Sequence, residues 1–288
     1  MPTASRHAEV WGSPIQHSLS PVLHRAAYDS LGVDWSYNRR EVGEQDFSAV
    51  WALEGPLLSG LSVTMPLKER LVDVIPDRDS VVNSLGVANT AYRTSDGWAV
   101  TNTDPWGVVG ALDEEGVHPK QVLILGAGAT ARAVGYGVSL LGVSRVELLV
   151  RNRERAHTTE AILGELGVEV TVLTDPNSVD LRSDLVVSTL PGGVDSQLSL
   201  PPALIHTAAL FDVSYSPWPS SVAQLWAEGA SPVISGVSLL LHQALRQIRY
   251  FLHASGEEAL DREATVLAAM KNAVGYQSGP SRQLHMGE

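Results

Sequence analysis

The feature that most constrains the fold is a glycine turn between two apolar segments in the stretch 122–153. The apolar run Val122–Leu125 leads directly into the turn GAGATA, and an apolar helix-like segment (133–141) and a second apolar run (146–150) follow. This order of strand, turn, helix and strand is typical of a dinucleotide site, where glycines turn the chain and let backbone approach a pyrophosphate. The helix N-terminus then offers N–H groups to the phosphates. We predict a nucleotide site; the alternative is a turn that only packs the helix against the strand.

The end of the second strand indicates which nucleotide binds. Sites for NAD place an acidic residue about 20 residues after the turn, to hold the ribose 2′-hydroxyl, whereas sites for NADP place an arginine near the 2′-phosphate. This chain has Arg151, Asn152, Arg153 and Arg155 there, and Glu154 is the one acidic residue of the run. Guanidinium groups bind phosphate oxygens as a bidentate fork. We therefore expect NADP(H); the alternative is that these arginines only solvate the start of a helix.

Composition restricts the class of protein. Of the 288 residues, 44% are apolar and 18% are charged, which suits a folded chain with a full core. The net charge of −12 argues against binding of nucleic acid or of an anionic membrane. The sequence has no cysteine, which excludes disulfides and thiol catalysis.

Signals of export and membrane insertion are not visible in the sequence. The N-terminal residues contain no apolar core of a signal peptide, and no window holds about eighteen consecutive apolar residues. We expect a soluble cytoplasmic protein whose partners are small molecules. The sequence does not distinguish a monomer from a homodimer.

The alternation of strands and helices predicts an α/β fold with two domains. We assign the range 1–103 to a substrate-binding and catalytic domain. The range 104–235 carries the glycine turn and predicts a Rossmann-like dinucleotide-binding domain. Two helical segments, 237–254 and 257–272, follow. We expect the range 236–275 to return to the first domain and 276–288 to form a flexible tail.

Two patterns in the first domain place polar side chains at the start of a helix. Ser18 and Ser20 stand before a helix that begins with Pro21, where hydroxyl and N–H groups could bind a carboxylate or phosphate, although N-capping by Ser20 is the simpler interpretation. In the run SVTMPLK, a strand ends near Thr64, a proline breaks it, and Lys68 follows in the first turn of a helix. The helix dipole disfavours a cation there, which suits Lys68 to acid–base chemistry; a solvated surface lysine is the alternative.

Two further patterns flank a predicted hairpin. Asn89 precedes it in LGVANT, and Asp104 follows it in TNTDPWG. Asp104 could also be only the N-cap of the next helix, because Pro105 would then occupy the first helical position.

Taken in order, these patterns resemble the shikimate dehydrogenase family along nearly the whole chain. The family pattern is Ser-x-Ser-Pro, Asn-Val-Thr-x-Pro-x-Lys, Gly-Ala-x-Asn-Thr, Asn-Thr-Asp, a Gly-Ala-Gly-Gly turn, Asn-Arg-Thr and Gly-x-x-Met-Leu-x-x-Gln. The matching segments here are SLSP (18–21), SVTMPLK (62–68), GVANT (86–90), NTD (102–104), GAGA (126–129), NRE (152–154) and GVSLLLHQ (236–243). Several matches in register are far more specific than any one of them.

The resemblance implies an oxidoreductase acting on a CH–OH group, which reversibly reduces 3-dehydroshikimate to shikimate with NADPH in the biosynthesis of chorismate and aromatic amino acids. It implies that Lys68 and Asp104 are the catalytic pair, since a lysine supplies both a proton and a positive charge to a developing alkoxide. The substrate-binding residues that it implies are Ser18, Ser20, Thr64, Asn89, Tyr215 and Gln243. The cofactor-binding residues that it implies are Gly126, Ala127, Gly128, Ala129, Thr130, Asn152, Arg153 and Gly236; it implies no metal.

Some positions depart from the family pattern. Ser62 replaces the usual asparagine, so one substrate hydrogen bond would be lost or would come from a shorter side chain. Glu154 replaces the usual threonine and puts an acid beside the expected 2′-phosphate, which weakens the preference for NADP over NAD. An alternative function is that of a relative that acts on quinate or an amino-substituted shikimate. A second alternative is a non-catalytic relative that binds NADP(H) and regulates a partner, although such a protein would have no need of Lys68 and Asp104.

Overall fold

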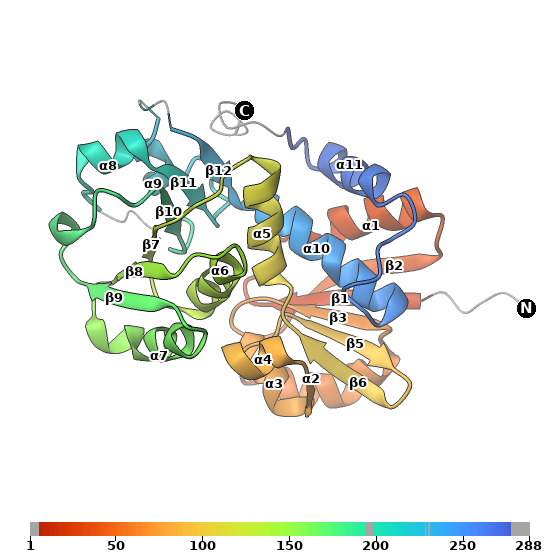
Figure 1. Cartoon of the computed structure of the whole chain (residues 1–288). Helices are drawn as coiled ribbons and strands as arrows, with labels where there is room; N and C mark the ends of the chain where they lie inside the picture. The colour runs from red at the N-terminus through yellow and green to blue at the C-terminus, as the bar shows by residue number, and fades with distance from the viewer. Residues whose placement is uncertain (1–5, 194–197, 228, 230, 278–288) are drawn as a thin grey trace, which may run out of the picture. The chain divides into compact units, whose positions relative to one another are not determined.

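The computed structural model describes residues 6–193, 198–227, 229 and 231–277, and the chain divides into two compact units. Unit 1 takes in the described residues up to 103 together with 243–275, and unit 2 takes in 104–242 with Tyr276 and Gln277. Each unit is a sheet with helices packed on it (Figure 1), which confirms the predicted α/β fold. The later division falls inside helix α10 (Gly236–His253), between residues 242 and 243, whereas the predicted boundary was residue 236.

The sheet of unit 1 is mixed. Its strands are β1 (Arg6–Gly12), β2 (Trp35–Glu41), β3 (Gly60–Val63), β4 (Asp77–Arg78), β5 (Thr90–Thr94) and β6 (Gly97–Thr101), in the order β2-β1-β3-β5-β6-β4. β1 pairs in parallel with β2 and β3, whereas β5 pairs antiparallel with β3 and β6. The helices of this unit are α1 (Ser20–Leu31), α2 (Phe47–Glu54), the 3-10 turn η1 (Gly55–Leu57), α3 (Lys68–Val74), α4 (Ser80–Leu85), the second part of α10, and α11 (Glu263–Ala273).

One face of this sheet forms an apolar core, to which β3 contributes alternate hydrophobic residues and β1 contributes a tryptophan. Trp11, Leu61 and Val63 are buried there, and α2 and α3 contribute Phe47 and Leu71. The rings of Trp11 and Phe47 meet edge to face, with their centroids 6.0 Å apart. Burial of each such side chain stabilises the fold by about 1.5–3 kcal/mol.

The other face of the sheet carries polar side chains as well as apolar ones. Tyr37 of β2 stacks on His24 of α1, with 3.8 Å between the ring centroids. Phe251 of α10 packs over Gly60, where an added Cβ would lie 2.6 Å from the ring. Only glycine therefore lets α10 approach β3 so closely, and α10 brings its polar residues to this face.

The sheet of unit 2 is parallel throughout its described strands. These are β7 (Val122–Leu125), β8 (Arg145–Leu149), β9 (Glu169–Leu173), β10 (Leu185–Ser188), β11 (Ala209–Asp212) and β12 (Val233–Ser235), in the order β12-β11-β10-β7-β8-β9. The helices are α5 (Asp104–Glu114), α6 (Ala129–Leu140), η2 (Arg153–Ala156), α7 (His157–Glu165), η3 (Pro176–Ser178), α8 (Pro202–Thr207), α9 (Ser221–Leu225) and the first part of α10. The chain leaves β7 toward β8 and later resumes on its other side with β10, so the order of strands reverses between β7 and β10. Sheets of this kind bind ligands beyond the carboxyl ends of their strands at that position.

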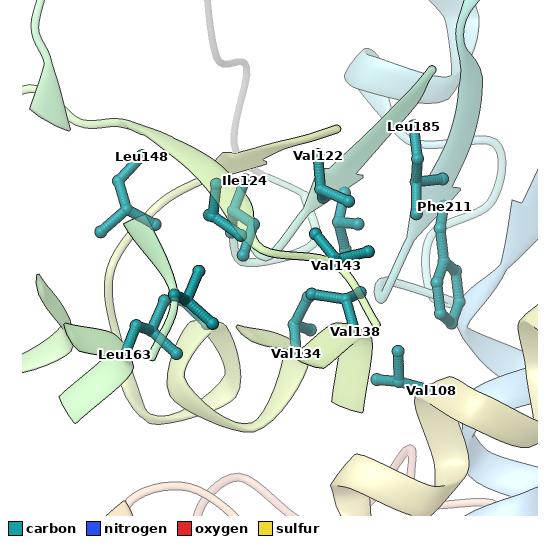
Figure 2. Packing of buried hydrophobic residues seen from close by; sticks show 14 of the residues in the cluster. Val108, Val122, Ile124, Val134, Val138, Val143, Leu148, Leu163, Leu185 and Phe211 are labelled. Carbon is teal, nitrogen blue, oxygen red and sulfur yellow. The ribbon is translucent and has the colours of Figure 1, made fainter. Parts of the chain in front are cut away.

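Both faces of this sheet are apolar, as a buried parallel sheet requires. Val122 and Ile124 of β7 pack with Val134 and Val138 of α6 (Figure 2). Alternate residues of the same strand, Leu123 and Leu125, point into a second core that includes Trp226. The continuous apolar run Val122–Leu125 is thus explained by burial of both faces of β7.

Three predicted helix boundaries need correction. Helix α1 has Leu19 as its N-cap residue and no side-chain cap, so Ser20 is the first helical residue and not the cap. Helix α6 begins at Ala129 rather than residue 133, because the extended Gly128 directly precedes its first turn. The last helix begins at Glu263, several residues after the predicted start at Glu257.

The C-terminal segment also differs from the predicted flexible tail. Tyr276 is buried, and its hydroxyl lies 3.0 Å from Oε1 of Glu115. Burial of the ring and the hydrogen bond to a carboxylate therefore hold Tyr276, the first residue of the predicted tail, in place. From residue 278 onward, the predicted tail lies outside the described residues.

Candidate functional site

The loop after β1 carries the two serines predicted to hold a carboxylate. Ser20 is buried at the first position of α1, and its backbone N–H lies 3.4 Å from Oγ of Ser18. Gly12 ends β1 against Thr64, since an added Cβ would lie 2.5 Å from the methyl carbon of that threonine. The loop that begins at Gly12 and the strand end at Thr64 therefore lie side by side.

An open pocket with a volume of 480 Å³ borders Ser18. Three arginines and Glu9 are part of its lining. Glu9 pairs with Arg40 at 2.8 Å, whereas the guanidinium groups of Arg25 and Arg39 donate to backbone carbonyl oxygens. This lining favours an anion at the Ser18 end of unit 1.

Lys68 is the first residue of α3, and its side chain is half-buried. Its carbonyl oxygen accepts a hydrogen bond from the N–H of Ala88 at 2.9 Å. One residue later, the carbonyl oxygen of Asn89 accepts from the N–H of Val63 at 2.8 Å. Backbone hydrogen bonds therefore join the end of β3, the start of α3 and the segment that leads into β5.

Asn89, Thr103 and Gln243 form a buried hydrogen-bonded cluster. The N–H of Thr103 donates to Oδ1 of Asn89 at 2.9 Å, and Nδ2 of Asn89 donates to Oγ1 of Thr103 at 3.0 Å. The Thr103 hydroxyl lies 3.2 Å from Oε1 of Gln243. The structure thus brings together two of the predicted substrate residues, Asn89 and Gln243, through a threonine to which the sequence assigned no role.

The hydroxyl of Ser62, which replaces the asparagine of the family pattern, faces partners within the protein. Ser62 is 3% exposed; its Oγ accepts from the Tyr37 hydroxyl at 2.8 Å and donates to Oε1 of Gln247 at 3.0 Å. Sequence reasoning missed Tyr37 and Gln247. A signal for Gln247 was present, because it follows Gln243 by four residues and so lies on the same side of a helix.

Asp104 opens α5 in unit 2, directly after Thr103 in the chain. It is 5% exposed and is followed by Pro105 in the first turn. Helix α6 packs closely against this turn at Gly137, where an added Cβ would lie 2.8 Å from the carbonyl oxygen of Pro105. The predicted catalytic acid is therefore a buried residue on a firmly packed helix, while Lys68 belongs to unit 1.

The glycine turn has the geometry that a phosphate cradle requires. Gly126 has a φ of +105°, and an added Cβ would lie 2.6 Å from Oγ1 of Thr189. An added Cβ at Gly128 would meet nothing within 4 Å, so the backbone before α6 borders open space. Around the turn, Ala127, Ala129 and Thr130 are half-buried, and the carbonyl oxygen of Ala127 accepts from Thr159 at 2.8 Å. A ligand could therefore approach the N–H groups of α6 without displacing a side chain at Gly128.

The segment after β8 holds the predicted 2′-phosphate residues. Oδ1 of Asn152 accepts from the N–H of Glu154 at 2.9 Å and so caps η2. Arg153 donates to the carbonyl oxygen of Val172 at 2.9 Å and lies 3.7 Å from Glu160. The exposed guanidinium groups of this segment belong to Arg151, Arg153 and Arg155.

The segment after β11 carries Tyr215, and a close backbone contact joins it to the start of α10. Tyr215 is half-buried, and burial raises the pKa of its phenol. Gly236 lies so close to the carbonyl oxygen of Val213 that any Cβ would clash with it. Asp212 is buried and accepts from the N–H of Ser214 at 3.0 Å, and burial raises the pKa of its carboxyl group.

Neither a metal centre nor a membrane segment is found in the part of the chain that the structure describes. No group of three or more histidine or acidic side chains there could hold a metal ion. No described helix combines the length and the hydropathy that crossing a bilayer requires.

Comparison with known proteins places this chain in a family. Residues 10–91 match the shikimate dehydrogenase substrate binding domain. A protein of Thermosynechococcus vestitus named shikimate dehydrogenase (NADP(+)) is 30% identical over 278 residues, which cover 93% of this chain and 96% of that protein. This chain belongs to the shikimate dehydrogenase family. The predicted resemblance is thereby confirmed.

Solved shikimate dehydrogenase structures share the fold over nearly their whole length. The crystal structure of Mycobacterium tuberculosis shikimate dehydrogenase is 35% identical with a TM-score of 0.80, over 93% of this chain and 99% of that one. A shikimate 5-dehydrogenase from Mycobacterium fortuitum is 33% identical with a TM-score of 0.79, over 95% and 99% of the two chains. Both units therefore have counterparts in shikimate dehydrogenases.

The shikimate dehydrogenase motifs divide between the two units. Unit 1 contains Ser18, Ser20, Thr64, Lys68, Asn89 and Gln243, and unit 2 contains Asp104, the glycine turn, Asn152, Arg153, Tyr215 and Gly236. Within unit 1, Asn89 and Gln243 share a cluster, and backbone hydrogen bonds link the Lys68 segment to Asn89.

Proposed function

We propose that this chain catalyses the reversible, NADPH-dependent reduction of 3-dehydroshikimate to shikimate, in the route to chorismate and the aromatic amino acids. The observation that carries the proposal is the buried cluster of Asn89, Thr103 and Gln243. It supplies carboxamides suited to ring hydroxyl groups, and it is tied by backbone hydrogen bonds to the segment that begins with Lys68. The name of the Thermosynechococcus relative, which matches nearly the whole chain, supports the same reaction.

The cofactor assignment rests on the open cradle at Gly128. The backbone N–H groups at the start of α6 would hold the pyrophosphate, and Gly126, Ala127, Ala129 and Thr130 would surround it. Arg153 and Asn152 would hold the 2′-phosphate, and Gly236 would be a further cofactor-binding residue. When bound, NADPH supplies a hydride to the ketone carbon of the substrate.

Lys68 supplies the proton in this proposal. Its ammonium group donates a proton to the carbonyl oxygen as that oxygen becomes an alkoxide, so that ketone, hydride and proton together give the alcohol. In the oxidation direction, the neutral amine accepts the proton of the hydroxyl group. Asp104 acts with Lys68 by orienting the amine and the substrate hydroxyl.

The remaining site residues would bind the substrate and determine which compound is accepted. Ser18 and Ser20 would hold the carboxylate, at the end of unit 1 where Arg25 and Arg39 supply positive charge. Thr64, Asn89 and Gln243 would bind the ring hydroxyl groups, and Tyr215 would contribute from unit 2. We propose that the protein carries out this reaction in the cytoplasm.

Product analysis tests the proposal. Incubation of the protein with 3-dehydroshikimate and NADPH should yield a product whose mass has risen by two hydrogen atoms and which coelutes with shikimate. Faster oxidation of quinate or an aminoshikimate than of shikimate, with NADP as the hydride acceptor, would instead assign the chain to a relative with another substrate. Binding of NADPH, with neither reduction of 3-dehydroshikimate nor oxidation of these alcohols by NADP, would indicate a regulatory relative.

A further inference from the structure

Asn89 stands at the end of a continuous chain of side-chain hydrogen bonds inside unit 1. The Tyr37 hydroxyl donates to Oγ of Ser62 at 2.8 Å, and the Ser62 hydroxyl donates to Oε1 of Gln247 at 3.0 Å. Nε2 of Gln247 donates to Oγ1 of Thr90 at 3.0 Å, and the Thr90 hydroxyl donates to Oδ1 of Asn89 at 2.6 Å. We call these five side chains the relay.

The relay is buried along its whole length. None of its five members is more than 3% exposed. A buried polar group that loses its partner has no bulk water to replace it, so each hydrogen bond of the relay constrains the next. The orientation of the Gln247 amide therefore influences the orientation of the Asn89 amide.

Neighbouring groups fix the polarity of the two amides of the relay. The backbone N–H of Thr103 can only donate, and it donates to Oδ1 of Asn89 at 2.9 Å, so Nδ2 of Asn89 is turned to Oγ1 of Thr103. Nε2 of Gln247 also lies 3.5 Å from the carbonyl oxygen of Asn89, which can only accept. Nε2 of His24 lies 3.3 Å from Oε1 of Gln247 and donates to it in the tautomer that carries the proton on Nε2. All donors of the relay therefore point toward Asn89.

Thr103 extends this polarity to Gln243. The Thr103 hydroxyl lies 3.2 Å from two acceptors, Oδ1 of Asn89 and Oε1 of Gln243. Oδ1 of Asn89 already accepts from the N–H of Thr103 and from the Thr90 hydroxyl, which favours donation to Gln243. With Oε1 of Gln243 turned to Thr103, the N–H groups of this carboxamide lie on the side away from Thr103. A hydroxyl oxygen of a bound ring can accept such hydrogen bonds, whereas an amide in the opposite orientation would need a donor from the ligand.

We propose that Gln247, acting through Thr90, is a positioning residue that holds Asn89 and Gln243 with their N–H groups directed to the hydroxyl groups of the substrate. The inference rests on the proposed function, because it takes Asn89 and Gln243 as substrate residues. Ser62 belongs to this relay and takes no part in binding the substrate. Gln247 and Thr90 thus govern the preference for a hydroxylated ring without touching it.

Replacement of Thr90 by valine tests the relay, because valine keeps the shape of threonine and removes only the hydroxyl. Thr101→Val is the matched control: Thr101 pairs directly with Thr90 across the β5–β6 hairpin, is equally buried, and donates its hydroxyl to Asp79 at 2.6 Å. In Thr90→Val, kcat/KM for shikimate should fall by about three- to tenfold, the effect of one hydrogen bond, while the KM for NADP is unchanged. Thr90→Ser, which restores the hydroxyl, should recover the kcat/KM of the wild type.

The relay is wrong if Thr90→Val and Thr101→Val change kcat/KM for shikimate equally, or if Thr90→Ser behaves as Thr90→Val. A second measurement separates this failure from failure of the proposed function. Exchange of the Asn89 side-chain amide protons with solvent, followed by nuclear magnetic resonance on the full chain, needs no substrate. It should be faster in Thr90→Val than in the wild type and in Thr101→Val, and equal exchange in all three proteins would overturn the relay even if shikimate is not turned over.

Discussion

The Thr103 hydroxyl lies 3.2 Å from Oε1 of Gln243, a residue 140 positions later in the sequence. This contact joins the short segment after β6 to α10, and the next residue after Thr103 is Asp104. Loss of one such buried hydrogen bond leaves its partner unsatisfied and costs about 1–3 kcal/mol. The contact therefore ties the proposed substrate carboxamides to the segment that supplies the proposed catalytic acid.

Lys68→Ala tests the proposed proton donor. We expect turnover of shikimate to fall by about 10²–10⁴-fold, because the alkoxide loses both its proton source and its compensating charge. Binding of NADPH, measured by calorimetry, should be unchanged, because the glycine turn lies in unit 2. Substantial turnover by this variant would show that another group moves the proton.

Arg153→Ala tests the choice of cofactor. We expect the KM for NADP to rise about tenfold or more, as for loss of a charged hydrogen bond, with little change in the KM for NAD. Arg145→Ala is a suitable control, since Arg145 is exposed on β8 and pairs with Glu169 at 3.0 Å. Equal losses with both cofactors would mean that Arg153 matters through its hydrogen bond to Val172, not through the 2′-phosphate.

Gly126→Ala tests whether the glycine turn binds the cofactor. Gly142→Ala is the control, because Gly142 also has a positive φ but lies outside the turn. Gly126 and Gly142 both have positive φ values, +105° and +86°, so alanine should destabilise the fold by about 1–3 kcal/mol at either position. Only Gly126 lies in the turn, where its Cβ would meet Thr189; at Gly142 it would meet nothing within 4 Å. We expect NADPH affinity to fall in Gly126→Ala alone. Equal affinity in the two variants would argue against a cofactor at the turn.

His24 makes the stability of the protein depend on pH. Burial lowers the pKa of its imidazole from 6.5 to about 3, against a smaller raising effect of the hydrogen bond with Gln247. Between these two values the unfolded chain binds a proton and the folded chain does not, so the free energy of unfolding falls as pH falls from about 6.5 toward 3, by about 1.4 kcal/mol per pH unit.

Chemical denaturation at a series of pH values measures this effect. The slope of unfolding free energy against pH should be shallower in His24→Gln, which has no ionisable group at that position. An unchanged slope would mean that His24 is not the group responsible.

The sequence predicted the parts of the site that depend on local order along the chain. The glycine turn, the strand before it and Lys68 at a helix start all follow from neighbouring residues, and the structure has them there. The start of α6 was misplaced because the turn itself forms the first helical residues. Helix α2 was not predicted, and no side chain caps its start at Asp46.

The relay could not be predicted, because it depends on contacts between distant segments. Tyr37 and Ser62 meet only because β1 pairs with both β2 and β3, which puts the two side chains on one face of the sheet. Gln247 reaches that face only because α10 packs closely over Gly60. Neither the register of the strands nor this close approach is encoded in a local pattern.

The most direct test of the proposed function is the rate of change at the reduced-nicotinamide absorbance band, with the purified protein and each pairing of shikimate or quinate with NADP or NAD. We predict rapid reduction of NADP with shikimate and much slower reaction in the other three pairings. Faster reaction with quinate, or equal reaction with NAD, would contradict the substrate or the cofactor assignment. No reaction in any pairing, with NADPH still bound, would contradict catalysis itself.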